Sequence, residues 1–463
     1  MLHYLRREPG FYKRLFLLAL PLILQNLITT SLGFVDTFMV GLLGDYELSA
    51  VTAANAPIFL IQVIIFGLMS GLTILVSQFW GKQDLASINR CMGFAMYTGL
   101  LITVLAALGL FLFPHQVLLL VTDNEILIEM GAPYLRIVGV SYVFNAVSSV
   151  YISMQRSAEN PALGMKVFAC SMLLNTFLNY CLIFGKFGAP ALGITGAALA
   201  TLASRVVEFL LTLGYALLNR RIPLMPRLLL HPGRAIAGTF VKYATPVLMN
   251  EALWGLGTTV MTAILGHMAH SADMLAAYTI MGNIDKFTTV SCFGLAGATA
   301  VILGKSIGEG DSRDHVYDLS WCLLLVSLLL GGLLAAVLAL ALPTVFVPYL
   351  YPLFSLSELA TEAAATMCVV YLVLLPLKAF DISNITGVLR AGGDVRMATI
   401  IDLTPLWCVA VPLAGLSALV LDAPLPLVCL GIYSENICKM PWGVHRLRSR
   451  KWINDVTTRG KTS

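Results

Sequence analysis

The residues of this sequence that could do chemistry are carboxylates inside long apolar stretches. Asp36, Glu251 and Asp381 each lie among hydrophobic residues, and Asp36 and Glu251 have no basic residue one helical turn away. A carboxylate in a membrane interior costs at least about 2.5–3.5 kcal/mol on insertion scales. We therefore expect these three side chains to face an internal, water-filled cavity, where a carboxylate can exchange a proton or bind Na⁺. The alternative is that they are structural acids held by hydrogen bonds.

Other charged residues in the apolar stretches have a simpler interpretation. Arg205 and Glu208 are three residues apart, as are Lys378 and Asp381, so each pair can form an ion pair on one helix. Such a pair lowers the cost of placing a charge in the membrane. Asp402 lies near the end of its apolar stretch, and we interpret it as a carboxylate at the membrane interface.

Two asparagines form a candidate polar network. Asn175 and Asn179 are four residues apart and share one helix face, which Thr201 in the next apolar stretch could join. These side chains could form a hydration network around Asp36. Alternatively, they only bind neighbouring helices together, as amides and hydroxyls do in lipid.

The composition excludes most soluble functions. Of 463 residues, 58% are hydrophobic and 12% are charged, against about 25% charged in soluble proteins. A net charge of +4 is too small for a nucleic-acid surface. The nine cysteines form neither a CxxC pair nor a cluster with histidine, which argues against a zinc site or a disulfide framework.

The elements that must position the polar residues are membrane-spanning helices. Crossing a hydrocarbon core of roughly 30 Å takes about 20 mostly apolar residues, and the first stretch is too long for a signal peptide. We count twelve stretches of this kind, which predict an all-α integral membrane protein, at residues 14–40, 51–78, 91–113, 131–153, 164–185, 192–218, 241–266, 276–304, 317–344, 364–389, 396–419 and 424–444.

The basic residues give the orientation. Most of the 29 Lys and Arg residues fall in the termini or in the even-to-odd connections between spans. Short cytoplasmic loops carry the excess of basic residues, so both termini are expected in the cytoplasm. We expect a multi-pass protein of the plasma (inner) membrane.

A weak internal repeat divides the twelve spans into two halves. Both halves have six spans and enter the membrane from the same side, as in rocking transporters built from parallel repeats. We expect an N-lobe at 1–218, a cytoplasmic linker at 219–240, a C-lobe at 241–444 and a cytoplasmic tail at 445–463. The matching segments are Phe66-Gly67-Leu68 with Phe293-Gly294-Leu295, Gly81 to Asp84 with Gly308 to Asp311, Pro21 with Pro246, and Gln155-Arg156-Ser157 with Leu389-Arg390-Ala391.

The sequence carries no motif for enzyme or ATP chemistry. Leu303 to Ser306 imitates the end of a P-loop, but Thr299 stands where that motif needs glycine. HExxH and GxSxG are absent from the sequence. We therefore expect no enzyme activity, no cofactor, no ATP and no nucleic acid.

Several segments together resemble the multidrug and toxic compound extrusion (MATE) family. The likeness extends over essentially the whole chain, and its strongest parts are Phe34 to Gly41, Gly81 to Asp84, Leu174 to Asn179 and Pro190 to Thr201. The resemblance implies two six-helix lobes in a V-shaped arrangement. It also implies export of organic cations and other amphiphiles in exchange for Na⁺ or H⁺.

The resemblance also implies roles for the polar residues. Asp36 with Asn175, Asn179 and Thr201 corresponds to the N-lobe cation or proton site. Glu251 and Asp381 match the acidic pair that couples transport in the C-lobe of the NorM-like branch, and Na⁺ could bind at any of the three carboxylates. Asp285 is a further candidate, although the neighbouring Lys286 could neutralise it, as Lys378 could neutralise Asp381.

Two main hypotheses about the function follow. The first is a secondary active multidrug exporter working by alternating access, with amphiphilic, cationic small molecules and membrane lipid as its partners. The second is a lipid-linked sugar flippase of the same superfamily, which would be expected to place several basic residues in its cavity to meet pyrophosphate. A channel or another polytopic membrane protein is a third and weaker reading.

Overall fold

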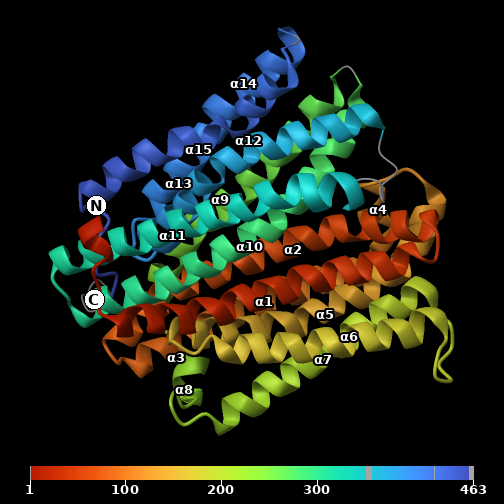
Figure 1. Ribbon diagram of the computed structural model, residues 1–463. Helices are drawn as coiled ribbons and strands as arrows, with labels where there is room; N and C mark the ends of the chain where they lie inside the picture. The colour runs from red at the N-terminus through yellow and green to blue at the C-terminus, as the bar shows by residue number, and fades with distance from the viewer. Residues whose placement is uncertain (1, 269, 351–356, 422, 458–463) are drawn as a thin grey trace. The chain divides into compact units, whose positions relative to one another are not determined.

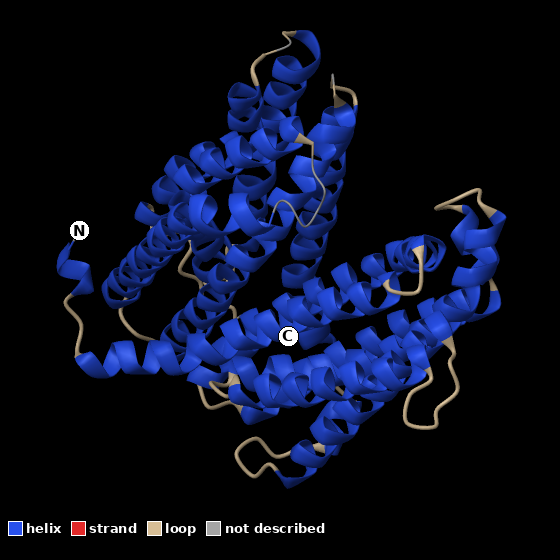
Figure 2. Cartoon of the chain, turned by 45° about the vertical axis from the view of Figure 1, so that its right-hand side comes forward, coloured by secondary structure: helices blue, strands red, loops and turns tan. Residues whose placement is uncertain are grey.

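The computed structural model describes residues 2–268, 270–350, 357–421 and 423–457, which contain helices and loops without a β-strand (Figure 2). Each predicted span coincides with a helical segment in this part of the chain. The helices of the first half are α1 (Pro9–Gly41), α2 (Asp45–Gly81), α3 (Leu85–Leu112), α5 (Glu125–Ser157), α6 (Ala162–Phe184) and α7 (Gly193–Leu218). Short helices η1 (Leu2–Leu5), α4 (Pro114–Leu119) and α8 (Pro226–Leu230) lie before or between them.

The second half begins with α9 (Arg234–Gly266), α10 (Ser271–Glu309) and α11 (Arg313–Ala341). Several of its helices change to wider π-helical turns. These are η2 (Leu342–Leu350) after α11, η4 (Ser383–Leu389) after α12 (Glu358–Ile382), and η5 (Leu406–Ala410) and η6 (Leu416–Val420) on either side of α14 (Val411–Gly415), which follow α13 (Val395–Pro405). The last helix is α15 (Leu425–Arg448) (Figure 1).

Ten of the long helices in the described residues are apolar enough to cross a membrane by length and composition. The other two predicted spans, α9 and α15, carry polar residues within their length. Asn250 and Glu251 lie in α9, and Glu435 and Lys439 lie in α15. The predicted all-α membrane architecture is therefore confirmed, and its two least apolar helices carry candidate site residues.

Local sequence explains where individual helices begin. The side chain of Asp84 accepts a hydrogen bond from the backbone N–H of Ser87 at the start of α3, at 3.0 Å. Asn124 accepts from the backbone N–H of Ile126 at the start of α5, also at 3.0 Å. Such caps satisfy N–H groups that have no partner within the helix.

The helices form two compact units. The N-half unit contains Leu24–Leu248 together with Thr457, and the C-half unit contains Met1–Ile23 and Met249–Val456. Two helices are divided between the units. The first part of α1 packs in the C-half unit, where Leu15 and Leu22 lie in one apolar cluster with Leu295 of α10.

The first part of α9 packs in the N-half unit. Its Phe240 ring lies 5.2 Å from the ring of Phe94 in α3. A Cβ atom on Gly71 of α2 would lie 2.7 Å from that of Ala244, so glycine is what allows α2 and α9 to approach this closely. The exchange is reciprocal, because each half of the sequence supplies one helix segment to the other unit.

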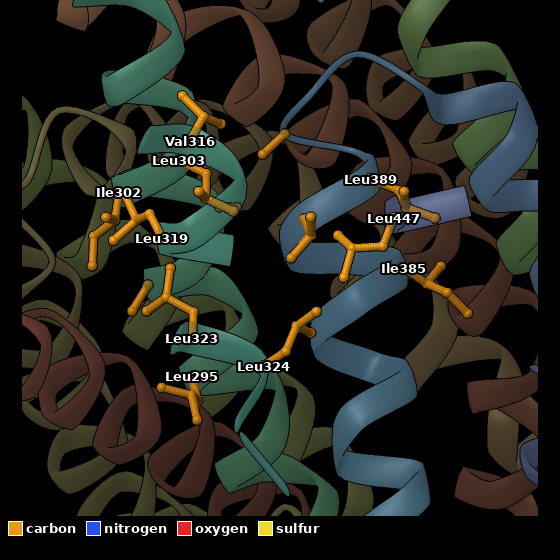
Figure 3. Close-up of a cluster of buried hydrophobic side chains, with 14 of the residues drawn as sticks. Leu295, Ile302, Leu303, Val316, Leu319, Leu323, Leu324, Ile385, Leu389 and Leu447 are labelled. Atoms are coloured by element: carbon orange, nitrogen blue, oxygen red, sulfur yellow. The ribbon is translucent and has the colours of Figure 1, made fainter. Parts of the chain in front are cut away.

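One of the buried apolar clusters of the C-half unit lies between α10, α11, η4 and α15. Leucines and other aliphatic residues from these helices point toward one another, as Figure 3 shows. Leu303, Leu323 and Leu389 have no exposed surface. Their helices are thus fixed against one another by this apolar packing.

Candidate functional site

In the N-half unit, the predicted polar residues form one connected network. Asn179 of α6 donates a hydrogen bond to the carboxylate of Asp36 in α1 at 2.6 Å and another to Asn175 at 3.0 Å. Asn175 in turn donates to the hydroxyl of Thr201 in α7 at 3.5 Å. Asn175 and Asn179 are both buried, at 1% exposed, whereas Asp36 is only partly buried. The structure thus brings together all four N-half residues, and a neutral amide faces the carboxylate.

A second polar cluster lies beside this network. Arg205 and Glu208 of α7 form an ion pair at 2.8 Å, and the Glu208 side chain is completely buried. Asn145 of α5 and Ser171 of α6 also donate to the Glu208 carboxylate, each at 3.4 Å. The charge of Arg205 also acts on Asp36. The expected local ion pair is therefore present, and it binds three helices together.

In the C-half unit, Glu251 has a cationic partner that lies far from it in the sequence. Glu251 of α9 accepts a hydrogen bond from Arg390 at 3.0 Å, and the Arg390 side chain is 4% exposed. Arg390 directly follows η4. The sequence places it in a connection between spans, whereas the structure places it in the protein interior.

A four-residue cluster is centred on Lys439 of α15. Its ammonium group lies 2.8 Å from Asp402 of α13 and 2.8 Å from Glu435, four residues earlier in α15. Asn250 of α9 donates a hydrogen bond to Asp402 at 2.8 Å. Asp402, interpreted from the sequence as an interfacial carboxylate, has a side chain that is 16% exposed and pairs with a buried lysine.

Asp381 of α12 lies close to the cluster around Lys439. Lys439, Asp402 and Glu435 all act electrostatically on it. The residue is 3% exposed, and its Oδ2 atom has no hydrogen-bond partner in the described part of the chain. A buried carboxylate oxygen without a partner is costly, so this position suits an occupant that brings a proton or a positive charge.

The helix changes its geometry directly after Asp381. The π-helical turns of η4 begin two residues later, and they contain Asn384, whose side-chain nitrogen and oxygen are both buried without a partner among the described residues. Such turns leave backbone and side-chain groups free for other contacts and are frequent at functional sites. The unsatisfied groups of Asp381 and Asn384 thus lie within one turn of each other.

The remaining predicted acid, Asp285 of α10, pairs with Lys378 of α12. The alternative of a local Lys378–Asp381 pair is therefore not what forms, because Lys378 reaches across to another helix. Lys286 is exposed, so the lysine that neutralises Asp285 is not its sequence neighbour. Helix rotation explains the difference, since adjacent residues point about 100° apart around a helix.

Sequence reasoning missed Arg390, Lys439, Glu435 and Asn250. One signal was available, because Glu435 and Lys439 are spaced for an ion pair on one helix face within the last span. Arg390 gave a different signal, since it occupies the position matched to Arg156 in the internal repeat. Across the described residues, His, Cys, Asp and Glu side chains form no group of three or more that could hold a metal ion.

Around the predicted site of the C-half unit, carboxylates outnumber cations. Arg390 and Lys378 each match one carboxylate, but Lys439 stands against Asp402, Glu435 and the nearby Asp381. A site with more carboxylates than cations can bind a proton or another cation and release it again. In the N-half unit, Asp36 likewise has amide partners rather than an ion pair.

Comparisons with known sequences agree on one protein family. A sequence model of the MatE family matches residues 21–181 and 246–416. The probable multidrug resistance protein NorM of Thermotoga maritima is 24% identical over 97% of this chain and 95% of that protein. The multidrug export protein MepA of Staphylococcus aureus is 23% identical over 87% of this chain and 86% of that protein.

Solved structures of similar fold are also found. A MOP superfamily transporter from Pyrococcus furiosus, whose binding pocket is described as having reverse polarity, matches with a TM-score of 0.85 and 19% identity, over 97% of this chain and 98% of that one. An outward-facing multidrug resistance MATE family transporter matches with the same score, identity and coverage. At this identity the likeness concerns the fold.

Proposed function

Because this chain belongs to the MATE family of membrane transporters, we propose that it exports cationic amphiphiles in exchange for inward Na⁺ or H⁺. The observation that carries the proposal is the set of carboxylates without a cation of their own. Asp36 and Asp381 lie in helices that span the membrane by length and composition, and neither forms an ion pair among the described residues. Each can therefore change its occupant without leaving a cationic side chain unpaired.

Glu251 has a different place in the proposal. Its charge is met by Arg390, so a cation or proton at Glu251 would release that arginine. We assign Asp36 and Asp381 as the primary coupling groups and Glu251 as a coupling group that acts through Arg390. Asn175, Asn179 and Thr201 hold Asp36 in position, and Asp285 serves as the structural partner of Lys378.

The proposed cycle is alternating access between the repeats expected at 1–218 and 241–444. An ion entering from outside occupies the free carboxylates and weakens the binding of a cationic substrate, and its release inside allows substrate to rebind. A membrane potential supplies about 2.3 kcal/mol per charge per 100 mV, which can drive export. The ion and the substrate must each bind one of the two access states more tightly, because a ligand with equal affinity for both states does not shift the equilibrium between them. In this proposal the basic connections and both termini lie in the cytoplasm, and the membrane is the inner one.

The flippase alternative is less favoured by the charges. A lipid pyrophosphate would need cations that are free to meet it. Arg205, Lys378, Arg390 and Lys439 each pair with a carboxylate. Arg156 donates instead to the hydroxyls of Thr73 and Ser153. The surplus charge is therefore negative, which suits a cationic substrate.

The test is efflux of a fluorescent organic cation from proteoliposomes under an imposed Na⁺ gradient or an imposed pH gradient. Asp381→Asn and Asp36→Asn remove one negative charge with little change in shape, and Asp123→Asn, at an exposed position between α4 and α5, is the matched control. We expect one gradient to drive efflux in the wild type and the control, and at least a tenfold lower rate in both test variants, on the order of 1.4 kcal/mol. Full activity in Asp381→Asn and Asp36→Asn would contradict the assignment of the coupling groups. Failure of both gradients would contradict the exchange itself.

A further inference from the structure

The N-half unit contains an apolar cavity that the proposed transport cycle does not use. It has a volume of about 450 Å³ and lies between α3, α5 and α7. Its walls are aliphatic and aromatic side chains, and the short helix α8 and the segment before it close one end. The residues that define it include Leu100, Phe144, Phe209, Leu213, Leu224 and Leu229.

The end of the cavity is built by the connection between the two halves of the sequence. Buried Asn89 of α3 donates a hydrogen bond to the carbonyl of Pro223 at 3.2 Å and accepts one from the N–H of Met225 at 3.0 Å. A Cβ atom on Gly93 would overlap the carbonyl oxygen of Leu229, so glycine allows α8 to lie directly on α3 (Figure 1). The connection expected as a linker is therefore fixed to α3, with Leu224 and Leu229 turned into the cavity.

The same end of the cavity carries positive charge. Arg90, Arg220, Arg221 and Arg227 are exposed, and Arg227 lies between the lining residues Leu224 and Leu229 in the sequence. Arg90 precedes Gly93 by three residues, so the two positions share one side of α3. No acidic residue occurs at 85–122 or at 209–250. The two segments that carry Arg90 and Arg227 therefore contain no acid, whereas Arg221 lies over the Trp80 ring, whose N–H donates to Glu159.

We propose that this cavity binds one acyl chain of an anionic phospholipid, with the phosphate group at Arg90 and Arg227. An apolar cavity beside a cluster of basic residues fits a ligand with a hydrocarbon part and an anionic part. Guanidinium groups bind phosphate oxygens through paired hydrogen bonds. An organic cation fits the apolar walls equally well, but the positive charges of Arg90 and Arg227 disfavour it.

The first test is native mass spectrometry of the delipidated full chain in detergent, titrated with phosphatidylglycerol or with phosphatidylethanolamine. The test variant is Arg90→Gln with Arg227→Gln. The control is Arg313→Gln with Arg396→Gln, which removes two exposed arginines from the C-half unit. We expect the wild type and the control to prefer phosphatidylglycerol, and the test variant to lose about fivefold in affinity for each arginine removed. Equal loss in the control, or no preference in the wild type, would overturn the proposal.

The second test fills the cavity without changing charge. Leu213→Trp enlarges a lining residue that is 39% exposed, and Leu210→Trp enlarges an exposed residue of the same helix outside the lining. We expect Leu213→Trp alone to weaken phosphatidylglycerol binding by at least tenfold, with unchanged thermal unfolding in both variants. Binding that survives Leu213→Trp would overturn the placement of the chain. Displacement of bound lipid by an organic cation at equal concentration would assign the cavity to substrate instead.

Discussion

The proposed coupling carboxylates of the two units lie in different chemical surroundings, although the N-half unit also contains a buried ion pair, Arg205–Glu208. In the N-half unit, Asp36 is held by a chain of neutral groups, Asn179, Asn175 and Thr201. In the C-half unit, the carboxylates stand against Arg390, Lys378 and Lys439. A neutral partner tolerates loss of the negative charge, whereas a buried cation does not. The two halves of a repeated fold thus place different constraints on a change of charge.

Matched positions of the repeat make the contrast sharper. Arg156 and Arg390 occupy equivalent places, yet Arg156 donates to the hydroxyls of Thr73 and Ser153, each at 3.3 Å, and Arg390 donates to Glu251 at 3.0 Å. The offset that relates Pro21 to Pro246 places Asn26 opposite Glu251. The repeat therefore preserves an arginine, while its backbone setting and the charge of its partner both change.

The largest expected effect is at the centre of the C-half cluster. Lys439→Gln leaves Asp402, Glu435 and Asp381 without their shared cation, which should lower the free energy of unfolding by about 3–5 kcal/mol. Lys13→Gln is the control, because Lys13 is exposed and lies in the first part of α1, which also packs in the C-half unit. It should change stability by less than about 1 kcal/mol. Denaturant titration of the protein in detergent measures both, and equal effects would refute the central role of Lys439.

The matched arginines test the comparison directly. Arg390→Gln leaves a carboxylate unpaired and should cost about 2–4 kcal/mol of unfolding free energy, whereas Arg156→Gln removes bonds to hydroxyls and should cost about 1–2 kcal/mol. Adding Glu251→Gln to Arg390→Gln should restore part of the loss. If the double variant is no more stable than Arg390→Gln alone, the Glu251–Arg390 pair does not carry the effect.

A smaller effect distinguishes the two lysines near Asp285. Lys378→Gln removes the partner of Asp285 and should lower stability by about 1–3 kcal/mol, since hydrogen bonds to charged groups have this range. Lys286 is exposed, so Lys286→Gln should change stability by less than about 0.5 kcal/mol. The same denaturant titration measures both variants. A larger loss of stability with Lys286→Gln than with Lys378→Gln would mean that Lys286, not Lys378, neutralises Asp285.

The smallest effect on stability is expected at Asp36. In Asp36→Asn the new amide oxygen can still accept from Asn179, so the free energy of unfolding should change by about 1 kcal/mol or less. This holds although transport should fall sharply in the efflux assay. A loss of 3 kcal/mol or more would mean that the negative charge itself holds the N-half network together.

The helices were predictable from the sequence because hydrophobic length is a local property. The N-half network was predictable in part, since Asn175 and Asn179 share a helix face by spacing alone. Pairs between helices, such as Glu251–Arg390 and Asp285–Lys378, depend on how each helix is rotated against its neighbours. Spacing within one helix contains no information on that rotation, and the π-helical turns of η4 alter it further after Asp381.

The exchange of segments between the units has a consequence for biosynthesis. Residues 2–23 leave the ribosome long before Met249, yet they pack with partners that begin at that residue. The N-half unit in turn lacks its Phe240 and Ala244 contacts until α9 has been made. Neither unit can complete its core while only the first six long helices exist. Assembly of the two halves is thereby linked to completion of the whole chain, and a nascent protein that stalls between them carries two unfilled interfaces.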